Sequence, residues 1–204
     1  VGRLERTLNT QYRGSGCNEV RDRARLSELD SSAIDWLAGR EDFELTPEHY
    51  AGRGLSRWLR VDEDLLTLLG FYLAEGSCSD RNGIRFSIGK GNERFTAEMS
   101  ERLERLFGLP PTLYRNRDRV AELRIVNRVA ALAWQRLFGF AGAESVTKAV
   151  PNIVFNVSES LRLAFLRGYL LGDGTAASGR IAFSTSSYDI ASALQYLLAA
   201  SGVV

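Results

Sequence analysis

Leu69-Gly70-Phe71-Tyr72-Leu73-Ala74-Glu75-Gly76-Ser77 and Arg167-Gly168-Tyr169-Leu170-Leu171-Gly172-Asp173-Gly174-Thr175 are two copies of one short motif. Each copy is an apolar run, typical of a helix, that ends in a single carboxylate followed by glycine. Glu75 and Asp173 are separated by the length of a small domain, which indicates a domain-sized duplication.

A carboxylate at the last turn of a helix is electrostatically unfavourable. The C-terminal end of a helix carries partial negative charge, so an acidic side chain there is repelled. A divalent cation held between the two helix ends would remove this repulsion, because magnesium takes carboxylate and carbonyl oxygens as ligands. The motif therefore predicts a Mg2+ site formed by the side chains of Glu75 and Asp173 and the freed carbonyl groups of Ala74 and Gly172.

Small residues in both copies predict how the two helices meet. Gly70 and Ala74 are spaced i, i+4, as are Gly168 and Gly172, so each pair lies on one helix face. Two slim faces allow close approach of the backbones, which would bring the terminal carboxylates together. The competing interpretation is a pair of core helices whose acids cap a helix or bind arginine, and the duplication in matching context argues against it.

The two motifs resemble the dodecapeptide motifs of the LAGLIDADG (DOD-type) homing endonucleases, and the closer likeness is to the endonuclease domains of archaeal inteins. Around the second copy the likeness extends to Lys148-Ala149-Val150-Pro151, which resembles a lysine-x-x-proline block of the family. It continues through Phe155-Asn156-Val157 and Ile181 to Ser187, and it covers the chain from about Leu59 onward.

The resemblance implies a mixed α/β (α+β) fold, the LAGLIDADG homing endonuclease fold, with two pseudo-symmetric αββαββα repeats. We expect residues 58–140 to form the first repeat and residues 141–204 the second. Compared with the first copy, two strands and a helix are missing after Val204, so the second repeat is expected to be truncated. Residues 1–57 are expected to be a linker or accessory region beside a splicing domain.

The resemblance also implies a function: a site-specific double-strand DNA endonuclease, encoded within an intein, that hydrolyses phosphodiesters with Mg2+. Glu75 and Asp173 would each serve one DNA strand. Lys148 would polarise the attacking water or steady the phosphate. Two alternatives stay open, a regulator of the same fold that binds DNA without cutting it and an RNA maturase.

The distribution of charge favours a nucleic-acid surface in the first repeat. The net charge is only +1, but basic residues outnumber acidic ones between Arg81 and Phe140. Such a stretch can supply phosphate contacts, although solvated strand faces would give the same pattern. The candidate DNA-binding residues are Arg85, Lys90, Arg115, Arg117, Arg119, Arg124 and, in the second copy, Arg180.

Hydrophobic periodicity and end signals predict the individual elements. Caps are expected at Ser31-Ser32, Asn92 and Ser158. The expected helices span residues 31–37, 62–74, 92–107, 128–138, 158 onward and 188–200, and the expected strands span 84–88, 112–116, 120–126, 175–178 and 180–186.

Composition limits the remaining possibilities. The chain contains no apolar run of the roughly 18 residues that a membrane span requires, and no signal peptide is recognisable, so a cytoplasmic location without membrane contact is expected. Cys17 and Cys78 do not suggest a disulfide scaffold, and a single His49 argues against histidine-based metal chemistry. We expect a monomer with two internal repeats.

Overall fold

The computed structural model describes residues 27, 29–40, 43–47, 54–79, 81–89, 93–116, 119–177 and 180–203, without the side chains of Asn116 and Arg119. The chain divides into two compact units, Val1–Phe43 and Glu44–Val204. The expected cap Asn92 and the residues Cys17 and His49 lie outside the described residues.

The first unit contains helix α2 (Ser31–Ala38). The structure confirms the predicted helix, but the expected cap is wrong. Asp30 is the N-cap, and its carboxylate accepts a hydrogen bond from the backbone N–H of Ala33 at 2.8 Å. Ser32 donates its hydroxyl to the same carboxylate at 2.7 Å, because a charged acceptor is the stronger partner.

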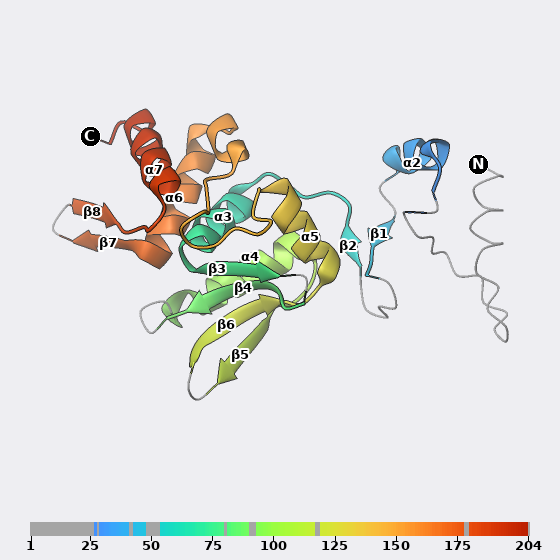
Figure 1. The fold of residues 1–204 in the computed structure, drawn as a ribbon, viewed down its shortest axis with the longest axis horizontal. Helices are drawn as coiled ribbons and strands as arrows, with labels where there is room; N and C mark the ends of the chain where they lie inside the picture. The colour runs from blue at the N-terminus through green and yellow to red at the C-terminus, as the bar shows by residue number, and fades with distance from the viewer. Residues whose placement is uncertain are drawn as a thin grey trace. The chain divides into compact units, whose positions relative to one another are not determined.

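The second unit combines helices with three antiparallel sheets (Figure 1). A mixed α/β fold is thereby confirmed. No helix in the described part of the chain has the length and apolar character needed to cross a membrane. The elements of the second unit are β1 (Glu44–Leu45), β2 (Leu55–Ser56), α3 (Glu63–Glu75), β3 (Gly76–Ser79), β4 (Gly83–Ile88), η2 (Glu93–Phe95), α4 (Thr96–Phe107), β5 (Thr112–Asn116), β6 (Arg119–Ile125), α5 (Arg128–Leu137), η3 (Asn152–Asn156), α6 (Glu159–Asp173), β7 (Gly174–Ala177), β8 (Arg180–Phe183) and α7 (Tyr188–Ala200).

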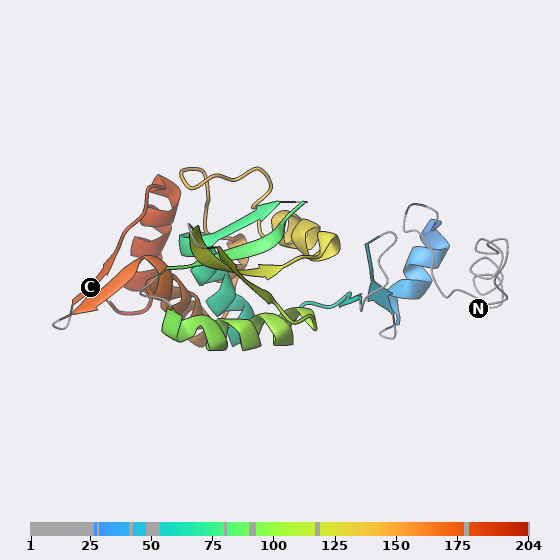
Figure 2. The ribbon, with the colours of Figure 1, turned by 90° about the horizontal axis from the view of Figure 1, so that it is seen from below.

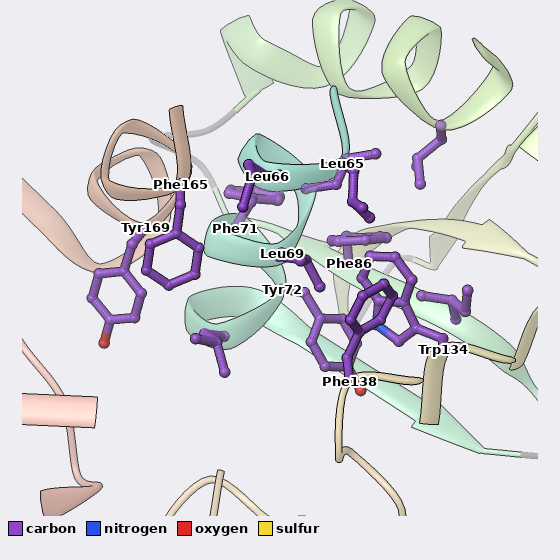
Figure 3. Close-up of a cluster of buried hydrophobic side chains, with 14 of the residues drawn as sticks. Leu65, Leu66, Leu69, Phe71, Tyr72, Phe86, Trp134, Phe138, Phe165 and Tyr169 are labelled. Carbon is purple, nitrogen blue, oxygen red and sulfur yellow. The ribbon is translucent and has the colours of Figure 1, made fainter. Parts of the chain in front are cut away.

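The two motif helices, α3 and α6, lie side by side (Figures 1 and 3). Helix α3 begins after Asp62, whose carboxylate accepts from the N–H of Leu65 at 3.1 Å. Every residue from Leu65 to Leu73 is buried, so α3 has no solvent-facing stripe. A helix that is apolar all round has to be covered on all sides. In Figure 3, Phe165 of α6 lies on one side of α3, and Phe86 and Trp134 lie on the other.

The largest sheet has the strand order β3-β4-β6-β5. Its strands alternate as predicted: Ile84 and Phe86 of β4 are fully buried, while Arg85 between them is not. Helices α3, α4 and α5 pack against this sheet. The apolar face thus belongs to the core, and the polar face stays accessible.

An ion-pair cluster fixes α4 against the start of α3. Arg102 is only 8% exposed, and its guanidinium binds Asp64 of α3 at 2.5 Å and Glu98 at 3.0 Å. Arg105 binds the same Asp64 at 2.6 Å. These hydrogen bonds lower the pKa of Asp64, and the largest contribution comes from Arg105. Asp64 is also favourable in the first helical turn, where the helix dipole attracts negative charge.

The second copy repeats the order of the first. Helix α6, hairpin β7–β8 and helix α7 correspond to α3, β3–β4 and α4. The β7–β8 hairpin extends away from the four-stranded sheet in both views (Figures 1 and 2). The order supports the predicted duplication.

Two expected helix starts differ in detail. Helix α4 begins at Thr96, after the short 3-10 turn η2 rather than at residue 92. Ser158 precedes α6, but its side chain caps no backbone N–H. Its hydroxyl instead lies 2.9 Å from that of Ser160, since two neighbouring hydroxyls can pair with each other.

Candidate functional site: the meeting ends of the two motif helices

The glycines of the motifs lie where the backbones of α3 and α6 touch. A Cβ added at Gly70 would overlap the carbonyl oxygen of Phe165, and one added at Gly168 would overlap the carbonyl oxygen of Thr67. At Gly172 a Cβ would overlap the methyl of Ala74 and lie 3.1 Å from Cγ of Glu75. The small residues therefore act as predicted, because any side chain at these positions would separate the helices.

The glycine after each carboxylate does not adopt the left-handed conformation that is typical of a glycine ending a helix. Gly76 (φ −93°, ψ 154°) and Gly174 (φ −111°, ψ 157°) are extended rather than left-handed. Each helix therefore passes directly into a strand. A Cβ would lie 2.5 Å from Cγ of Tyr72 in the first copy and 2.6 Å from Cα of Leu170 in the second. Glycine is needed at both positions because a side chain would overlap these neighbouring atoms.

Glu75 and Asp173 end α3 and α6 at the same side of this contact. Burial is the main cause that raises the pKa of Glu75, and the neighbouring charge of Asp173 raises it further. Burial also raises the pKa of Asp173, which Lys148 opposes. Two partly desolvated carboxylates that repel each other form a site with excess negative charge. Such a site favours a cation.

Lys148 occupies the end of α3. The side chain is buried, and its ammonium donates to the carbonyl oxygens of Tyr72 (3.2 Å), Leu73 (3.4 Å) and Gly76 (2.6 Å). It also lies 4.9 Å from the ring centroid of Tyr72. An ammonium has three protons, so these three bonds use its full donor capacity. Lys148 therefore caps the C-terminus of α3 and places positive charge where the helix dipole is negative.

The position of Lys148 is fixed from the second copy. Its carbonyl oxygen accepts a hydrogen bond from the hydroxyl of Ser187 at 2.7 Å. Ser187 is also the N-cap of α7 and accepts from the N–H of Ile190 at 3.3 Å. Burial lowers the pKa of Lys148, whereas Asp173 and Glu75 raise it. One lysine thus connects the end of the first motif helix with the start of α7.

The donor set suits magnesium better than zinc. Among the described residues, no group of three or more His, Cys, Asp or Glu side chains lies together. The site offers two carboxylates, and any further ligands have to be backbone carbonyls, water or substrate oxygens. Magnesium commonly binds one or two carboxylates and keeps several waters or phosphate oxygens. The residues present therefore fit the ion that the sequence predicts.

An open hollow of about 430 Å³ borders this end of α3. Its lining consists of Gly76, Ser77 and Cys78, residues 143–146, and Lys148. The thiol of Cys78 donates to the carbonyl oxygen of Ala131 at 3.7 Å. The hollow thus opens beside the first residues of β3, directly after α3 ends.

The predicted DNA-binding residues fall into different places. Arg85 and Arg124 are directly opposite each other on β4 and β6, on the polar face of the sheet. Arg115 is exposed on β5, and Arg180 is exposed at the start of β8. Lys90 and Arg117 lie outside the described residues, as does the side chain of Arg119.

Two side chains that contact Arg124, Glu122 and Tyr114, are not among the residues predicted from the sequence. Glu122 accepts a hydrogen bond from Nε of Arg124 at 2.7 Å, and the same carboxylate oxygen lies 2.7 Å from Nη2. The guanidinium carbon lies 3.9 Å from the ring centroid of Tyr114. The spacing of Glu122 and Arg124, two apart on one strand, signals a shared face. Tyr114 could be found only with the register of β5 against β6.

Comparison with known proteins finds one family match and several relatives. Residues 160–204 match the family described as LAGLIDADG-like domain. The chain is 30% identical over 194 residues to a DNA polymerase of Thermococcus hydrothermalis, an alignment that covers 91% of this chain and 10% of the relative. It is 32% identical over 193 residues to a DNA polymerase of Thermococcus kodakarensis, with 91% and 10% covered.

A third relative has a different name. The chain is 28% identical over 144 residues to a component of the A-type ATP synthase of Methanopyrus kandleri, covering 71% of this chain and 13% of the relative. The chain spans about a tenth of the length of the curated relatives it matches. The family match over residues 160–204 and the two packed motif helices confirm the resemblance to the LAGLIDADG family that is read from the sequence.

Proposed function

We propose that this chain is a site-specific double-strand DNA endonuclease domain that hydrolyses phosphodiesters with Mg2+. One observation carries the proposal. Gly70 and Gly168 let two helices pack at backbone contact, and Glu75 and Asp173 meet at one end with raised pKa values. A core packing role alone would not place two repelling carboxylates there, because burying like charges costs stability.

The residues of the site have separate tasks in the proposed reaction. Glu75 and Asp173 hold the ions, each serving one DNA strand, with the carbonyl groups of Ala74 and Gly172 as further ligands. When bound, divalent ions activate water, stabilise charge on the phosphate and assist the leaving oxygen. Lys148 supplies positive charge at the same place. It reaches a water or phosphate by releasing its longest bond, that to Leu73 at 3.4 Å.

The polar face of the β3-β4-β6-β5 sheet supplies the proposed duplex contact. Arg85 and Arg124 face each other across β4 and β6, and like charges directly opposite destabilise a sheet unless an anion or a counter-charge compensates them. DNA phosphates would provide such compensation for Arg85. Arg115 on β5 and Arg180 on the separate β7–β8 hairpin are further candidate contacts, and we assign Lys90, Arg117 and Arg119 to the interface from the sequence.

The relatives favour an intein as the setting. Proteins named as a DNA polymerase and as part of an ATP synthase share no common chemistry, yet each contains a segment similar to this chain over about a tenth of its length. A mobile insert explains this better than a host activity. On this proposal residues 58–140 and 141–204 are the two repeats of one monomer, and residues 1–57 are an accessory region.

The test is cleavage of a pool of random duplex sequences in Mg2+, with sequencing of the new DNA ends. The parent chain should produce ends at one sequence, and Glu75→Gln and Asp173→Asn should each remove cutting of one strand or both. Duplex binding without any cutting by the parent would contradict the nuclease and favour a regulator. Preferential binding of RNA in competition with the duplex would favour a maturase.

A further inference from the structure

If the chain binds duplex DNA as proposed above, one arginine on the sheet is held in a geometry suited to reading a base. The polar face of the β3-β4-β6-β5 sheet contains a row of residues in register, Ser77, Arg85, Arg124 and Thr112. The next row contains Glu122 and Tyr114. Arg124 differs from Arg85 in that two neighbours on this face orient its guanidinium.

Two contacts fix the plane of the Arg124 guanidinium. Nε and Nη2 both bind one oxygen of Glu122 at 2.7 Å, which fixes the side edge of the group. The ring of Tyr114 lies 3.9 Å below the guanidinium carbon and fixes the plane. The side chain of Arg124 is 24% exposed, so part of it still reaches solvent. The conformational entropy of the Arg124 side chain is therefore lost when the chain folds, so a ligand does not have to order this side chain when it binds.

The remaining edge of the group is a pair of donors. Nη1 and the outer N–H of Nη2 make no hydrogen bond to the described residues. Two parallel donors match the acceptor pair O6 and N7 that guanine presents in the major groove. The other bases present no such pair of acceptors, so this edge distinguishes guanine from them.

Charge argues for a base rather than a phosphate as the partner of Arg124. Glu122 neutralises its charge, so attraction to the DNA backbone is weak at this residue. Arg85 has no such ion pair among the described residues, so its positive charge is not neutralised in the way that Glu122 neutralises Arg124. Arg85 is therefore suited to a phosphate and Arg124 to a base edge. We propose that Arg124, positioned by Glu122 and Tyr114, reads one guanine in the major groove of the target.

The test is selection of bound duplexes from a random pool, followed by affinity measurements at several salt concentrations. The parent should select guanine at one position. Arg124→Lys keeps the charge but loses the planar fork, so its preference for guanine at that position should fall about ten-fold while the salt dependence keeps its slope. Glu122→Gln and Tyr114→Leu should reduce the same preference to a smaller degree, because they only loosen the guanidinium.

Arg85→Gln is the matched control on the adjacent strand. It should weaken binding to all duplexes alike and lower the salt slope by about one. Unchanged base preference in Arg124→Lys at every position would overturn the proposal, as would a lost preference in Arg85→Gln alone. Selection of guanine by a chain that never cuts would support this inference and contradict the nuclease. Failure of the parent to bind any duplex would overturn both.

Discussion

The ends of α3 and α6 have the same sequence pattern but are held in different ways. The end of α3 is capped by the ammonium of Lys148, which arrives from the second copy and binds three carbonyl groups. The end of α6 is held from within its own copy. The N–H of Ser184 donates to the carbonyl of Asp173 at 3.0 Å, and the hydroxyl of Tyr169 donates to the carbonyl of Ser184 at 2.9 Å.

This difference shows that a duplicated motif does not imply duplicated support. Glu75 is positioned by a distant charged side chain, whereas Asp173 is positioned by the hairpin that directly follows it. The two carboxylates therefore depend on different parts of the chain. Changes at Lys148 should act first on the Glu75 side of the site, and changes at Tyr169 on the Asp173 side.

The largest effect is expected from Lys148→Met. The substitution leaves the carbonyl oxygens of Tyr72, Leu73 and Gly76 without their buried donor and removes the positive charge that interacts with Glu75 and Asp173. Loss of one partner of a buried charged interaction costs about 3 kcal/mol. Chemical denaturation should show a lower free energy of unfolding by about this amount. A loss no larger than that of an exposed arginine, Arg136→Met for example, would contradict the capping role.

The second-largest loss of stability is expected from a substitution at the contact between α3 and α6. Ala at position 70 gains about 1 kcal/mol of helix propensity over glycine, but its methyl overlaps the backbone of α6. Overpacking of this kind costs about 3 kcal/mol, so Gly70→Ala should lower the free energy of unfolding by about 2 kcal/mol. Gly89→Ala is the control, because nothing lies within 4 Å of its added Cβ. Equal stabilities of the two variants would show that α3 and α6 do not touch there.

A smaller effect is expected at the end of α6. Tyr169→Phe removes only the hydroxyl that binds Ser184, and loss of one neutral hydrogen bond costs about 1 kcal/mol. Thermal unfolding of Tyr169→Phe and Lys148→Met under one condition compares the two ends directly. A larger drop in the melting temperature for Tyr169→Phe than for Lys148→Met would contradict the difference between the two helix ends.

The smallest effect is a dependence on pH in metal-free buffer. The folded chain raises the pKa of Glu75, so it binds that proton more tightly than the unfolded chain. The stability contributed by this group is therefore greatest at low pH. It falls as the pH rises from the ordinary carboxyl value of about 4 through the raised value. Asp64 behaves in the opposite way because its pKa is lowered, so the parent curve contains both effects.

Glu75→Gln isolates the contribution of this carboxyl. The variant should gain stability relative to the parent as the pH rises from about 4 to about 7, since it has no group that must lose its proton. Mg2+ should stabilise the parent at about pH 7 and should have less effect on the variant. A difference between the two chains that stays constant with pH would mean that the folded site does not disfavour the charged carboxylate.

The features that are local in sequence could be predicted. The paired glycines, the two terminal carboxylates and the alternation of Ile84, Phe86 and Ile88 follow from helix and strand periodicity, and the structure contains each of them. The expected caps at Ser31-Ser32 and Ser158 are wrong, because neighbouring side chains compete for the same hydroxyls. Several local acceptors lie within reach of a hydroxyl, and the pattern alone does not choose between them.

The features that depend on tertiary contacts could not be predicted. Lys148 is recognisable through a family block, but its three carbonyl partners lie at the end of α3, far away in the sequence. The stacking of Arg124 on Tyr114 requires the register of β5 and β6, which contains an irregularity after Tyr114. The glycine after each carboxylate suggests a helix stop in the sequence, whereas the structure shows a steric requirement that depends on the folded backbone.

Metal binding at the ends of α3 and α6 can be measured without a DNA target. Titration of the purified chain with Mn2+ as a spectroscopic substitute for Mg2+, in the absence of DNA, measures occupancy of the helix ends without requiring a target sequence. The parent should bind Mn2+, Glu75→Gln and Asp173→Asn should each weaken binding by about ten-fold or more, and the double variant should bind none. Binding by the double variant equal to that of the parent would contradict a metal site at these helix ends.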